Sequence, residues 1–362
     1  MQMITNVSDR SQGQFLKALH RKHVNKTPVW FMRQAGRYLP EYQKVRKQAG
    51  SFLALCKNPE LVCEVTLQPL NRFNLDAAII FSDILTIPDA LGLGLSVQAG
   101  KGISFSHPIQ SLTAIRALPK IDPSADLAYV MDGIKLTKQA LPNNMPLIGF
   151  AGSPWTMACY MLQGGSAKKF TNAIALMTEN PAALHELLSI LSDCVADYLI
   201  AQIDAGVDCI MLFDSWGGIL PPAAFKEFSL HYSQQIFAKI KASHVKAAPS
   251  ILFSKDINDL LLLASSGASA LSLASNINIG TAREQVGNRV ALQGNLDLAV
   301  VYQDEKTIIK AVEALINRFG PHPGHIFNLG HGIKPDMDPE KIKLICDVVH
   351  DYSARLFANV SC

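Results

Sequence analysis

An apolar run passes directly into a polar turn in the stretch Trp30-Phe31-Met32-Arg33-Gln34-Ala35-Gly36-Arg37-Tyr38-Leu39-Pro40. The apolar part, residues 28–32, has the character of a strand buried in a parallel sheet. Arg33 and Arg37 follow it, and each guanidinium can bind a carboxylate or phosphate through two hydrogen bonds. The stretch therefore predicts a strand that ends in an anion-binding turn, although arginines in turns are commonly solvated or paired with a neighbouring acid.

Seven more short apolar runs occur along the chain, and segments of helical periodicity separate them. Their nearly continuous apolar character is typical of strands that are buried on both faces. None of them alternates cleanly between polar and apolar residues. These runs cover residues 77–81, 146–150, 208–213, 250–253, 270–274, 290–293 and 325–329.

The intervening segments carry signals for the start and the end of helices. Asn58-Pro59 places a capping side chain before a proline at the first helical position, and Asn180-Pro181 repeats this arrangement. After the second pair, apolar residues recur at steps of three and four as far as Gly206, a residue suited to a left-handed helix cap. The pattern predicts one long amphipathic helix.

Eight strands that alternate with helices, without a linker or a shift in composition, predict an α/β fold. We expect a single (β/α)8 barrel over residues 1–362, with residues 1–26 as a helical or extended segment packed on it. The length beyond a simple barrel is assigned to loops, chiefly residues 87–145. A doubly wound sheet is the alternative, but Gly92-Leu93-Gly94 lacks the third glycine of a dinucleotide-binding turn.

Composition narrows the classes of function. The chain has 362 residues, 49% of them hydrophobic and 17% charged, and a net charge of +3 that is too small to indicate binding to nucleic acid or a membrane surface. Seven scattered cysteines without a C-x-x-C pair indicate neither a disulfide framework nor a zinc knuckle. The amino terminus lacks the apolar core of a signal peptide, so we expect a soluble cytoplasmic protein.

Polar residues follow six of the eight predicted strands, and in a (β/α)8 barrel these strand ends build the active site. Asp83 follows the second run and Ser215 the fourth. Each has a plain structural alternative, Asp83 as the cap of a helix beginning at Ile84 and Ser215 as a turn hydroxyl. The six polar segments are residues 33–37, 82–83, 152–155, 214–218, 294–297 and 328–332.

Six stretches, in order along nearly the whole chain, resemble the uroporphyrinogen decarboxylase family. They are PVWFMRQAGRYLPEY (28–42), IIFSDILTIPDALGLGL (79–95), IGFAGSPWTMACYM (148–161), FDSWGG (213–218), ALQGNLD (291–297) and FNLGHGI (327–333). The resemblance implies a single-domain barrel, usually a homodimer, that acts in porphyrin and heme biosynthesis. Such an enzyme converts the four acetate arms of uroporphyrinogen III to methyl groups, giving coproporphyrinogen III, without a metal or an organic cofactor.

The resemblance also assigns the site residues. Asp83, Arg33, Arg37, His331 and Tyr160 are implied as catalytic. The substrate contacts it implies are Arg33, Gln34, Ala35, Gly36, Arg37, Asp83, Tyr160, Ser215 and His331.

These residue types suit a tetrapyrrole with eight carboxylates and four pyrrole N–H groups. Arginines can bind the carboxylates, and Asp83 can accept from the N–H groups and stabilise the positive charge that develops when a pyrrole carbon is protonated. The proton donor stays open at this point. An arginine, protonated His331 and Tyr160 are the candidates. The resemblance favours Arg33 or Arg37, while histidine titrates nearer to neutral pH and is the chemically easier acid.

Three places depart from the family pattern. Asp256-Ile257-Asn258 stands after Lys255, where a glycine is usual; Ala274-Ser275 replaces an Asp-Trp pair; and Leu298 replaces a proline. These changes remove an acid and an aromatic side chain from one side of the expected rim. We expect them to affect the shape of the cleft, the rate or the preference among uroporphyrinogen isomers.

Two alternatives come from other classes. A corrinoid- or thiol-dependent methyltransferase of related fold would need zinc held by His and Cys, but the chain has no H-x-C pair, and no cysteine accompanies His322, His325 and His331 before Cys346. A non-catalytic tetrapyrrole-binding paralogue is the second alternative, and the three departures are compatible with it.

Overall fold

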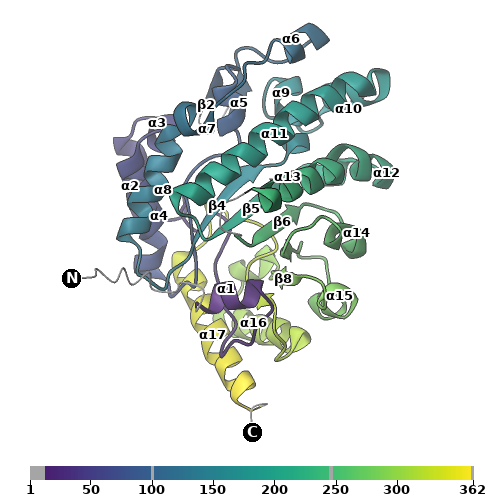
Figure 1. Cartoon of the computed structure of the whole chain (residues 1–362). Helices are drawn as coiled ribbons and strands as arrows, with labels where there is room; N and C mark the ends of the chain where they lie inside the picture. The colour runs from purple at the N-terminus through teal and green to yellow at the C-terminus, as the bar shows by residue number, and fades with distance from the viewer. Residues whose placement is uncertain (1–12, 99–101, 244–247, 360–362) are drawn as a thin grey trace, which may run out of the picture.

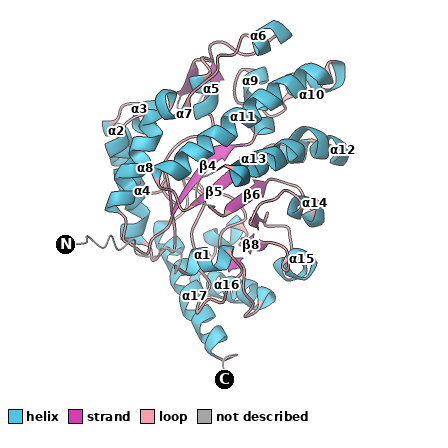
Figure 2. Ribbon diagram, viewed as in Figure 1, coloured by secondary structure: helices cyan, strands magenta, loops and turns pink. Residues whose placement is uncertain are grey.

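The computed structural model describes residues 13–98, 102–243 and 248–359, and shows a curled parallel sheet with helices around its outside (Figures 1 and 2). Seven strands form this sheet in the order β1-β4-β5-β6-β7-β8-β9. The predicted α/β fold is confirmed, with a strand at seven of the eight apolar runs. The strands are β1 (Ala78–Ile79), β4 (Leu147–Gly152), β5 (Cys209–Asp214), β6 (Ser250–Ser254), β7 (Ala270–Ser272), β8 (Ala291–Gln293) and β9 (His325–Ile326).

Every neighbouring pair in this sheet is parallel. Ile148 of β4 pairs with Cys209 of β5, and Phe213 of β5 pairs with Phe253 of β6. All residues of β4 and β6 are buried. Burial on both faces explains why these runs show no polar alternation in the sequence.

The helices begin and end largely where the sequence signals lie. The Asn58 and Asn180 side chains accept hydrogen bonds from the N–H groups of Leu61 and Ala183, and Gly206 ends the long helix at a φ of 119°. No described helix has the length and apolar character needed to cross a membrane. The helices of the described chain are α1 (Gln14–Leu19), α2 (Pro40–Gln48), α3 (Phe52–Cys56), α4 (Pro59–Arg72), α5 (Thr86–Ala90), α6 (Leu112–Arg116), α7 (Pro123–Asp126), α8 (Ala128–Ala140), α9 (Pro154–Gln163), α10 (Thr171–Glu179), α11 (Pro181–Ala205), α12 (Pro222–Phe225), α13 (His231–Ala242), α14 (Leu260–Ala264), α15 (Ile279–Val286), α16 (Glu305–Phe319) and α17 (Pro339–Ala358).

The first apolar run, residues 28–32, is not a regular strand. It makes one parallel bridge, Val29 with Phe327, next to β9, and the Val29 carbonyl accepts from the N–H of Asp76, just before β1 (2.8 Å). The chain then turns, since the N–H of Gln34 donates to the Phe31 carbonyl and Arg33 has a φ of 62°. The run therefore contributes a single bridge to the edge of the sheet and forms no ladder.

The assignment of residues 87–145 to loops was wrong. This stretch holds most of α5, an antiparallel hairpin of β2 (Leu95–Gln98) and β3 (Gly102–Phe105), and the helices α6, α7 and α8. α8 packs on α4 and α11. A side chain at Gly133 would place its Cβ 3.0 Å from Val62, so the glycine permits the close contact of α8 with α4.

The amino-terminal segment packs on the sheet in its described part. α1 buries Phe15, Leu16, Ala18 and Leu19 and contacts β9. Residues 1–12 of the segment expected over 1–26 lie outside the described residues. The six cysteines within the described part of the chain are unpaired, and Cys362 lies outside it.

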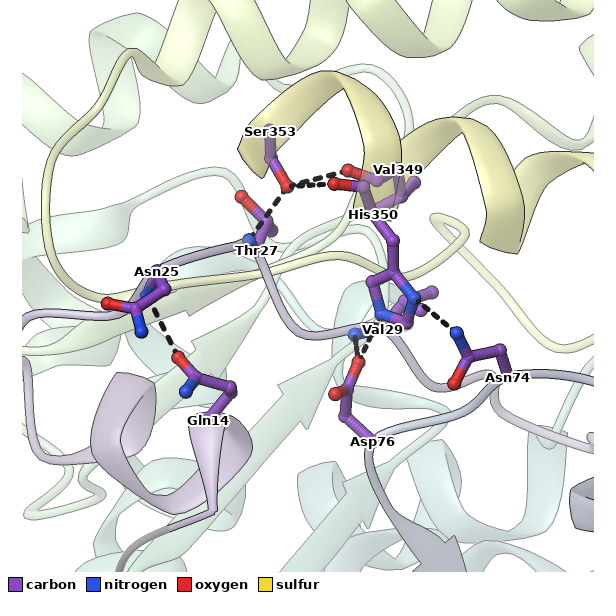
Figure 3. Close-up of polar contacts among 9 residues, drawn as sticks. All are labelled: Gln14, Asn25, Thr27, Val29, Asn74, Asp76, Val349, His350 and Ser353. Atoms are coloured by element: carbon purple, nitrogen blue, oxygen red, sulfur yellow. Dashed lines mark hydrogen bonds and ion pairs between the residues drawn. The ribbon is translucent and has the colours of Figure 1, made fainter. Parts of the chain in front are cut away.

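A group of polar contacts holds the first apolar run in place (Figure 3). One carboxylate oxygen of Asp76 accepts from the N–H of Val29 (2.8 Å) and contacts Nε2 of His350 on α17 (2.6 Å). Asn74 donates to Nδ1 of the same ring (3.0 Å), which leaves Nε2–H to donate to Asp76. The last helix thus ties residue 29 to the segment that enters β1.

A second contact repeats this connection one turn further along α17. The Thr27 N–H donates to Oγ of Ser353 at 2.9 Å, and that hydroxyl donates to the Val349 carbonyl (Figure 3). All three residues of this chain of contacts are buried. The run 27–29 is therefore held by α17 as well as by the edges of the sheet.

Asp76→Ala is expected to lower the free energy of unfolding by about 2–4 kcal/mol, because it leaves two buried donors, Val29 N–H and His350 Nε2–H, without an acceptor. Urea denaturation monitored by circular dichroism measures the change. Asp132→Ala is the control, since Asp132 forms an exposed pair with Lys135 at 3.5 Å and should change stability by less than about 0.5 kcal/mol. Equal effects of the two substitutions would contradict the role given to Asp76.

Candidate active site

A cavity of about 510 Å³ lies at the carboxyl ends of the strands. Its walls come from the turn after residues 28–32 and from the loops that follow β1, β5, β6 and β9. All predicted site residues except Gln34 line it. They are Arg33, Ala35, Gly36, Arg37, Asp83, Tyr160, Ser215 and His331.

Gln34 points away from the cavity. Its side chain is buried, accepts from the N–H of Phe31 (3.1 Å) and donates to the carbonyl of Ala77 (3.1 Å). It thereby ties the arginine turn to the residue that precedes β1. The structure gives Gln34 a supporting position rather than a place among the cavity walls.

The left-handed residue of the turn is Arg33, with a φ of 62°, and not Gly36. A Cβ on Gly36 would lie 3.2 Å from the Arg33 carbonyl oxygen. Gly332 is more tightly constrained, because a Cβ there would meet the Arg33 side chain at 2.7 Å. The glycine after His331 therefore leaves room for the stem of the first arginine.

Arg33 lies among charged and ionisable groups. Burial lowers the pKa of Arg33, and the neighbouring Arg37 lowers it further, while Tyr160 and Asp83 oppose the shift. Two guanidinium groups on one turn repel each other when no anion is bound. The arrangement favours binding of a polycarboxylate.

Asp83 is held in a turn and does not cap a helix at Ile84. Its Oδ1 accepts from the N–H of Leu85 at 2.8 Å, and α5 begins only at Thr86. Burial raises the pKa of Asp83 above the ordinary range, although the Leu85 N–H and the charge of Arg33 favour the ionised form. The result is an acceptor with little solvation beside a cationic wall.

His331 is neutral around pH 7. Its pKa is lowered to about 4 by burial and by the positive charges of Arg33 and Lys255. Nδ1 accepts from the N–H of Gly332 at 2.8 Å, so the proton of the neutral ring lies on Nε2. The imidazole can therefore donate a hydrogen bond but carries no acidic imidazolium proton.

Aromatic side chains form the apolar part of the cavity. Phe150, Phe213 and Phe253 come from the adjacent strands β4, β5 and β6, with ring centroids 5.5 and 6.1 Å apart. Tyr160 on α9 is edge-on to Trp216 at 6.2 Å, and burial raises the pKa of its hydroxyl. The sequence pattern placed the three phenylalanines in strands buried on both faces, because periodicity does not distinguish a cavity wall from packed interior.

The three tryptophans divide between core and cavity. Trp30 is buried and donates to the Gln293 side chain (2.7 Å), and Trp155 is buried and donates to the carbonyl of Trp216 (3.0 Å). Only Trp216 lines the cavity. Trp155 thus supports the loop that carries Ser215.

Asp214, the last residue of β5, holds the start of this loop in place through its side-chain hydrogen bonds. Its carboxylate is buried, and a Cβ on Gly217 would lie 2.2 Å from one of its oxygens. Burial raises the pKa of Asp214, and its hydroxyl partners oppose that shift. The hydroxyls that donate to it belong to Ser153 (2.8 Å), Thr156 (3.1 Å), Ser229 (2.8 Å) and Ser254 (2.8 Å).

Sequence reasoning missed two groups of basic residues. Lys255, in the loop after β6, lines the main cavity. A second hollow of about 560 Å³ adjoins the first at Arg37 and is lined by Arg46 and Lys47 of α2. Arg46 and Lys47 lie on α2, the helix that begins at Pro40 directly after the arginine turn. A helical pattern continuing from Pro40 could therefore have indicated that they lie near Arg37.

The three departures from the family pattern occupy close contacts. Asp256 has a φ of 61°, the left-handed conformation that glycine adopts freely. Ser275 packs directly on Gly330, because a Cβ on Gly330 would lie 2.2 Å from the Ser275 hydroxyl oxygen. Leu298 begins a 3-10 helix (Leu298–Tyr302) capped by Asp297, whose side chain accepts from the N–H of Ala299.

The described residues contain no group of three His, Cys, Asp or Glu side chains arranged to hold a metal ion. The cavity instead combines cations, aromatic rings and the half-buried carboxylate of Asp83. Together, the fold and the site define an α/β protein with a cation-lined cavity at the carboxyl edge of a parallel sheet.

Comparison with known proteins identifies the family. The family model described as "Uroporphyrinogen decarboxylase (URO-D)" matches residues 10–352, so the chain belongs to the uroporphyrinogen decarboxylase family. It is 51% identical over 346 residues to a uroporphyrinogen decarboxylase of Thioalkalivibrio sulfidiphilus, covering 95% of this chain and 99% of that protein. It is 49% identical over 343 residues to that of Ruthia magnifica, covering 94% and 99%.

Solved structures of other proteins share the fold. A methyltransferase from Methanosarcina mazei superposes with a TM-score of 0.76 at 17% identity, covering 93% of this chain and 97% of the other. A B12-independent methionine synthase from Shewanella gives a TM-score of 0.53 at 11% identity, covering 84% and 88%. At these identities the likeness concerns the fold alone.

Asp83→Asn is expected to raise the free energy of unfolding at neutral pH. The pKa of Asp83 is raised in the folded protein, so the folded state resists ionisation of this group. The wild-type protein therefore loses stability as the pH rises from the unfolded pKa of about 4 to the raised folded pKa. Below the unfolded pKa this loss is absent. The amide oxygen can still accept from the Leu85 N–H. Urea denaturation at pH 4 and pH 7.5 should show a gain that grows with pH.

The matched control for this measurement is Asp132→Asn on the exposed face of α8, which should show no such trend. A loss of stability in Asp83→Asn at pH 7.5 would contradict the raised pKa of Asp83.

Proposed function

We propose that this chain is a uroporphyrinogen decarboxylase, a carboxy-lyase of porphyrin and heme biosynthesis. It removes carbon dioxide from the four acetate arms of uroporphyrinogen III and gives coproporphyrinogen III. The observation that carries this proposal is the half-buried carboxylate of Asp83 in the same cavity as Arg33 and Arg37. Membership of the family supplies the identity of the substrate.

The cavity suits the chemistry of this substrate. Arg33 and Arg37 can bind carboxylate arms through two hydrogen bonds each, and the phenylalanines of β4, β5 and β6 offer apolar contact to pyrrole rings. Asp83 accepts from the pyrrole N–H groups at the centre. Tyr160 and Ser215 orient the arms by hydrogen bonding.

Decarboxylation requires a proton on the pyrrole before carbon dioxide leaves. Protonation of a ring carbon places a positive charge on the pyrrole, and the C–C bond to the carboxylate then breaks with its electron pair moving towards the ring. A proton added at the exocyclic carbon and one lost from the ring complete the methyl group. Asp83 stabilises the cation more than the neutral ring, so its effect is on the transition state.

Arg33 is the residue that we assign as proton donor. Burial and Arg37 lower its pKa, which makes the guanidinium a stronger acid than it is in water. His331 has a pKa of about 4 and no proton on Nδ1, so it serves as a hydrogen-bond donor to a carboxylate. Burial raises the pKa of Tyr160, which makes its hydroxyl a weaker acid.

We propose further that the sheet closes through residues 28–30 into a single-domain (β/α)8 barrel, and that two copies associate in the cytoplasm. The bridge between Val29 and Phe327 and the bond from the Asp76 N–H to Val29 support closure. The dimer and the location rest on resemblance to the family. Sedimentation equilibrium decides the dimer, because a single chain has a mass of 39.4 kDa.

Anaerobic incubation with uroporphyrinogen III tests the activity. The products, separated by their number of carboxylates, should include species with seven, six, five and four. A protein that forms none of them but binds the tetrapyrrole would be a non-catalytic paralogue. The shared fold of the Methanosarcina mazei methyltransferase makes methyl transfer the other outcome to assay.

Asp83→Asn should lower turnover by about a thousandfold, because a neutral amide cannot stabilise the pyrrole cation as a carboxylate does. The far-ultraviolet circular dichroism should be unchanged. Asp204→Asn, at an exposed position of α11, should retain full turnover. Unchanged turnover in Asp83→Asn would refute the role of the carboxylate.

His331→Gln should weaken the reaction without changing the shape of the pH dependence of kcat/KM between pH 5.5 and 8. The pKa of His331 is about 4, so the free protein already holds this ring neutral throughout that range. Steady-state rates across the range provide the measurement. Loss of an ionisation near pH 6–7 in the variant would show that His331 titrates during catalysis.

A further inference from the structure

Lys255 stands across the sheet from the arginine turn. Residues 28–30 lie between β1 and β9, and the order of the sheet places β6 fourth from them in either direction, through β1, β4 and β5 or through β9, β8 and β7. Lys255 follows β6 directly and lines the cavity. The cavity therefore has a cation on the side opposite to Arg33 and Arg37.

Backbone contacts fix the position of Lys255. Its N–H donates to the carbonyl of Asp214 at 3.0 Å. A Cβ on Gly218 would lie 2.7 Å from the Lys255 carbonyl oxygen and 2.6 Å from Cβ of Asp256, so the last glycine of FDSWGG packs directly on this turn. Asp256, the next residue, has a φ of 61° and does not line the cavity.

The ammonium group is placed by weak partners. It lies 5.6 Å from the centre of the Trp216 ring and 3.7 Å from a carboxylate oxygen of Asp256. The Asp256 side chain is 66% exposed, so this long ion pair holds the ammonium only loosely. Both partners orient the lysine and leave its N–H donors able to bind a carboxylate.

The charge of Lys255 acts inside the site. Together with Arg33 it lowers the pKa of the intervening His331, while Asp256 acts in the opposite sense. Lys255 and His331 both line the cavity, so the lysine charge lies near the imidazole within one site. Phe253, two residues before Lys255, is edge-on to the His331 ring at 5.9 Å, which agrees with that proximity.

We propose that Lys255 binds a non-reacting carboxylate arm of the substrate, on a ring opposite to the one held by Arg33 and Arg37. The inference rests on the proposed function. Four of the eight carboxylates survive every step, so a cation that acts throughout the reaction must bind one of those four. Lys255 thus holds the octacarboxylate and each later intermediate with similar strength.

Lys255→Met and Lys255→Arg test the assignment, with Lys310→Met on the exposed face of α16 as the control. Lys255→Met should raise KM about tenfold for both uroporphyrinogen III and the five-carboxylate intermediate, and should change kcat by less than about threefold. Lys255→Arg should restore much of the loss. Lys310→Met should change neither constant.

A binding measurement separates this inference from the proposed function. Quenching of tryptophan fluorescence by oxidised uroporphyrin III reports affinity without turnover, and Lys255→Met should weaken it by the same factor. If the wild-type protein binds but releases no carbon dioxide, the decarboxylase proposal fails and the comparison of affinities still tests Lys255. Unchanged affinity and KM in Lys255→Met, or a rise in KM for uroporphyrinogen III alone, would overturn the assignment.

A spectroscopic measurement excludes a merely structural role. Removal of the lysine charge should raise the pKa of His331 above about 4, as followed by NMR titration of labelled histidine. Lys255→Arg and Lys310→Met should leave that pKa near its wild-type value. A pKa that does not move in Lys255→Met would show that the ammonium lies outside the site in solution.

Discussion

The cavity depends on the buried carboxylate of Asp214. Hydroxyls from the helix after β4, from the end of β6 and from the π-helix over residues 226–230 converge on it. A buried carboxylate without donors is strongly unfavourable, so these elements are held at one distance from β5. Ser215 and Trp216 follow Asp214 in sequence, and Lys255 follows Ser254, so the position of three cavity residues derives from this one group.

The cavity is electrostatically costly before a ligand binds. Arg33 and Arg37 repel each other, Lys255 adds a third positive charge, and Asp83 is partly stripped of solvent. Each shifted pKa corresponds to a free-energy cost of holding the charged form of that group in the folded protein. A polyanion would relieve this repulsion, and the positive charge that would attract it is local, since the net charge of the chain is only +3.

The residues at the expected departures from the family pattern fit the local backbone of this chain. Asp256 adopts the left-handed conformation at a place where glycine is usual, and aspartate tolerates this better than most residues. Ser275 fills the space against Gly330. Both residues are thus accommodated by the backbone around them.

Local pattern was sufficient for seven strands, the capped starts of α4 and α11 and the polar strand ends, because burial and capping act over a few residues. It failed for residues 28–32, where a turn at Arg33 cuts the strand short, and for residues 87–145, where α8 was taken for a loop. Motif resemblance identified residues of the cavity wall, but it could not show that the Gln34 side chain points away from the cavity and donates to the carbonyl of Ala77.

The sequence by itself determined the α/β class, the family and the chemical types that the site needs, since these depend on composition, periodicity and order along the chain. Only the tertiary structure decided which groups meet. The neutral state of His331, the four hydroxyls on Asp214 and the place of Lys255 opposite Arg33 all arise between residues far apart in sequence. Their physical cause is desolvation and proximity, which exist only once the strands are assembled.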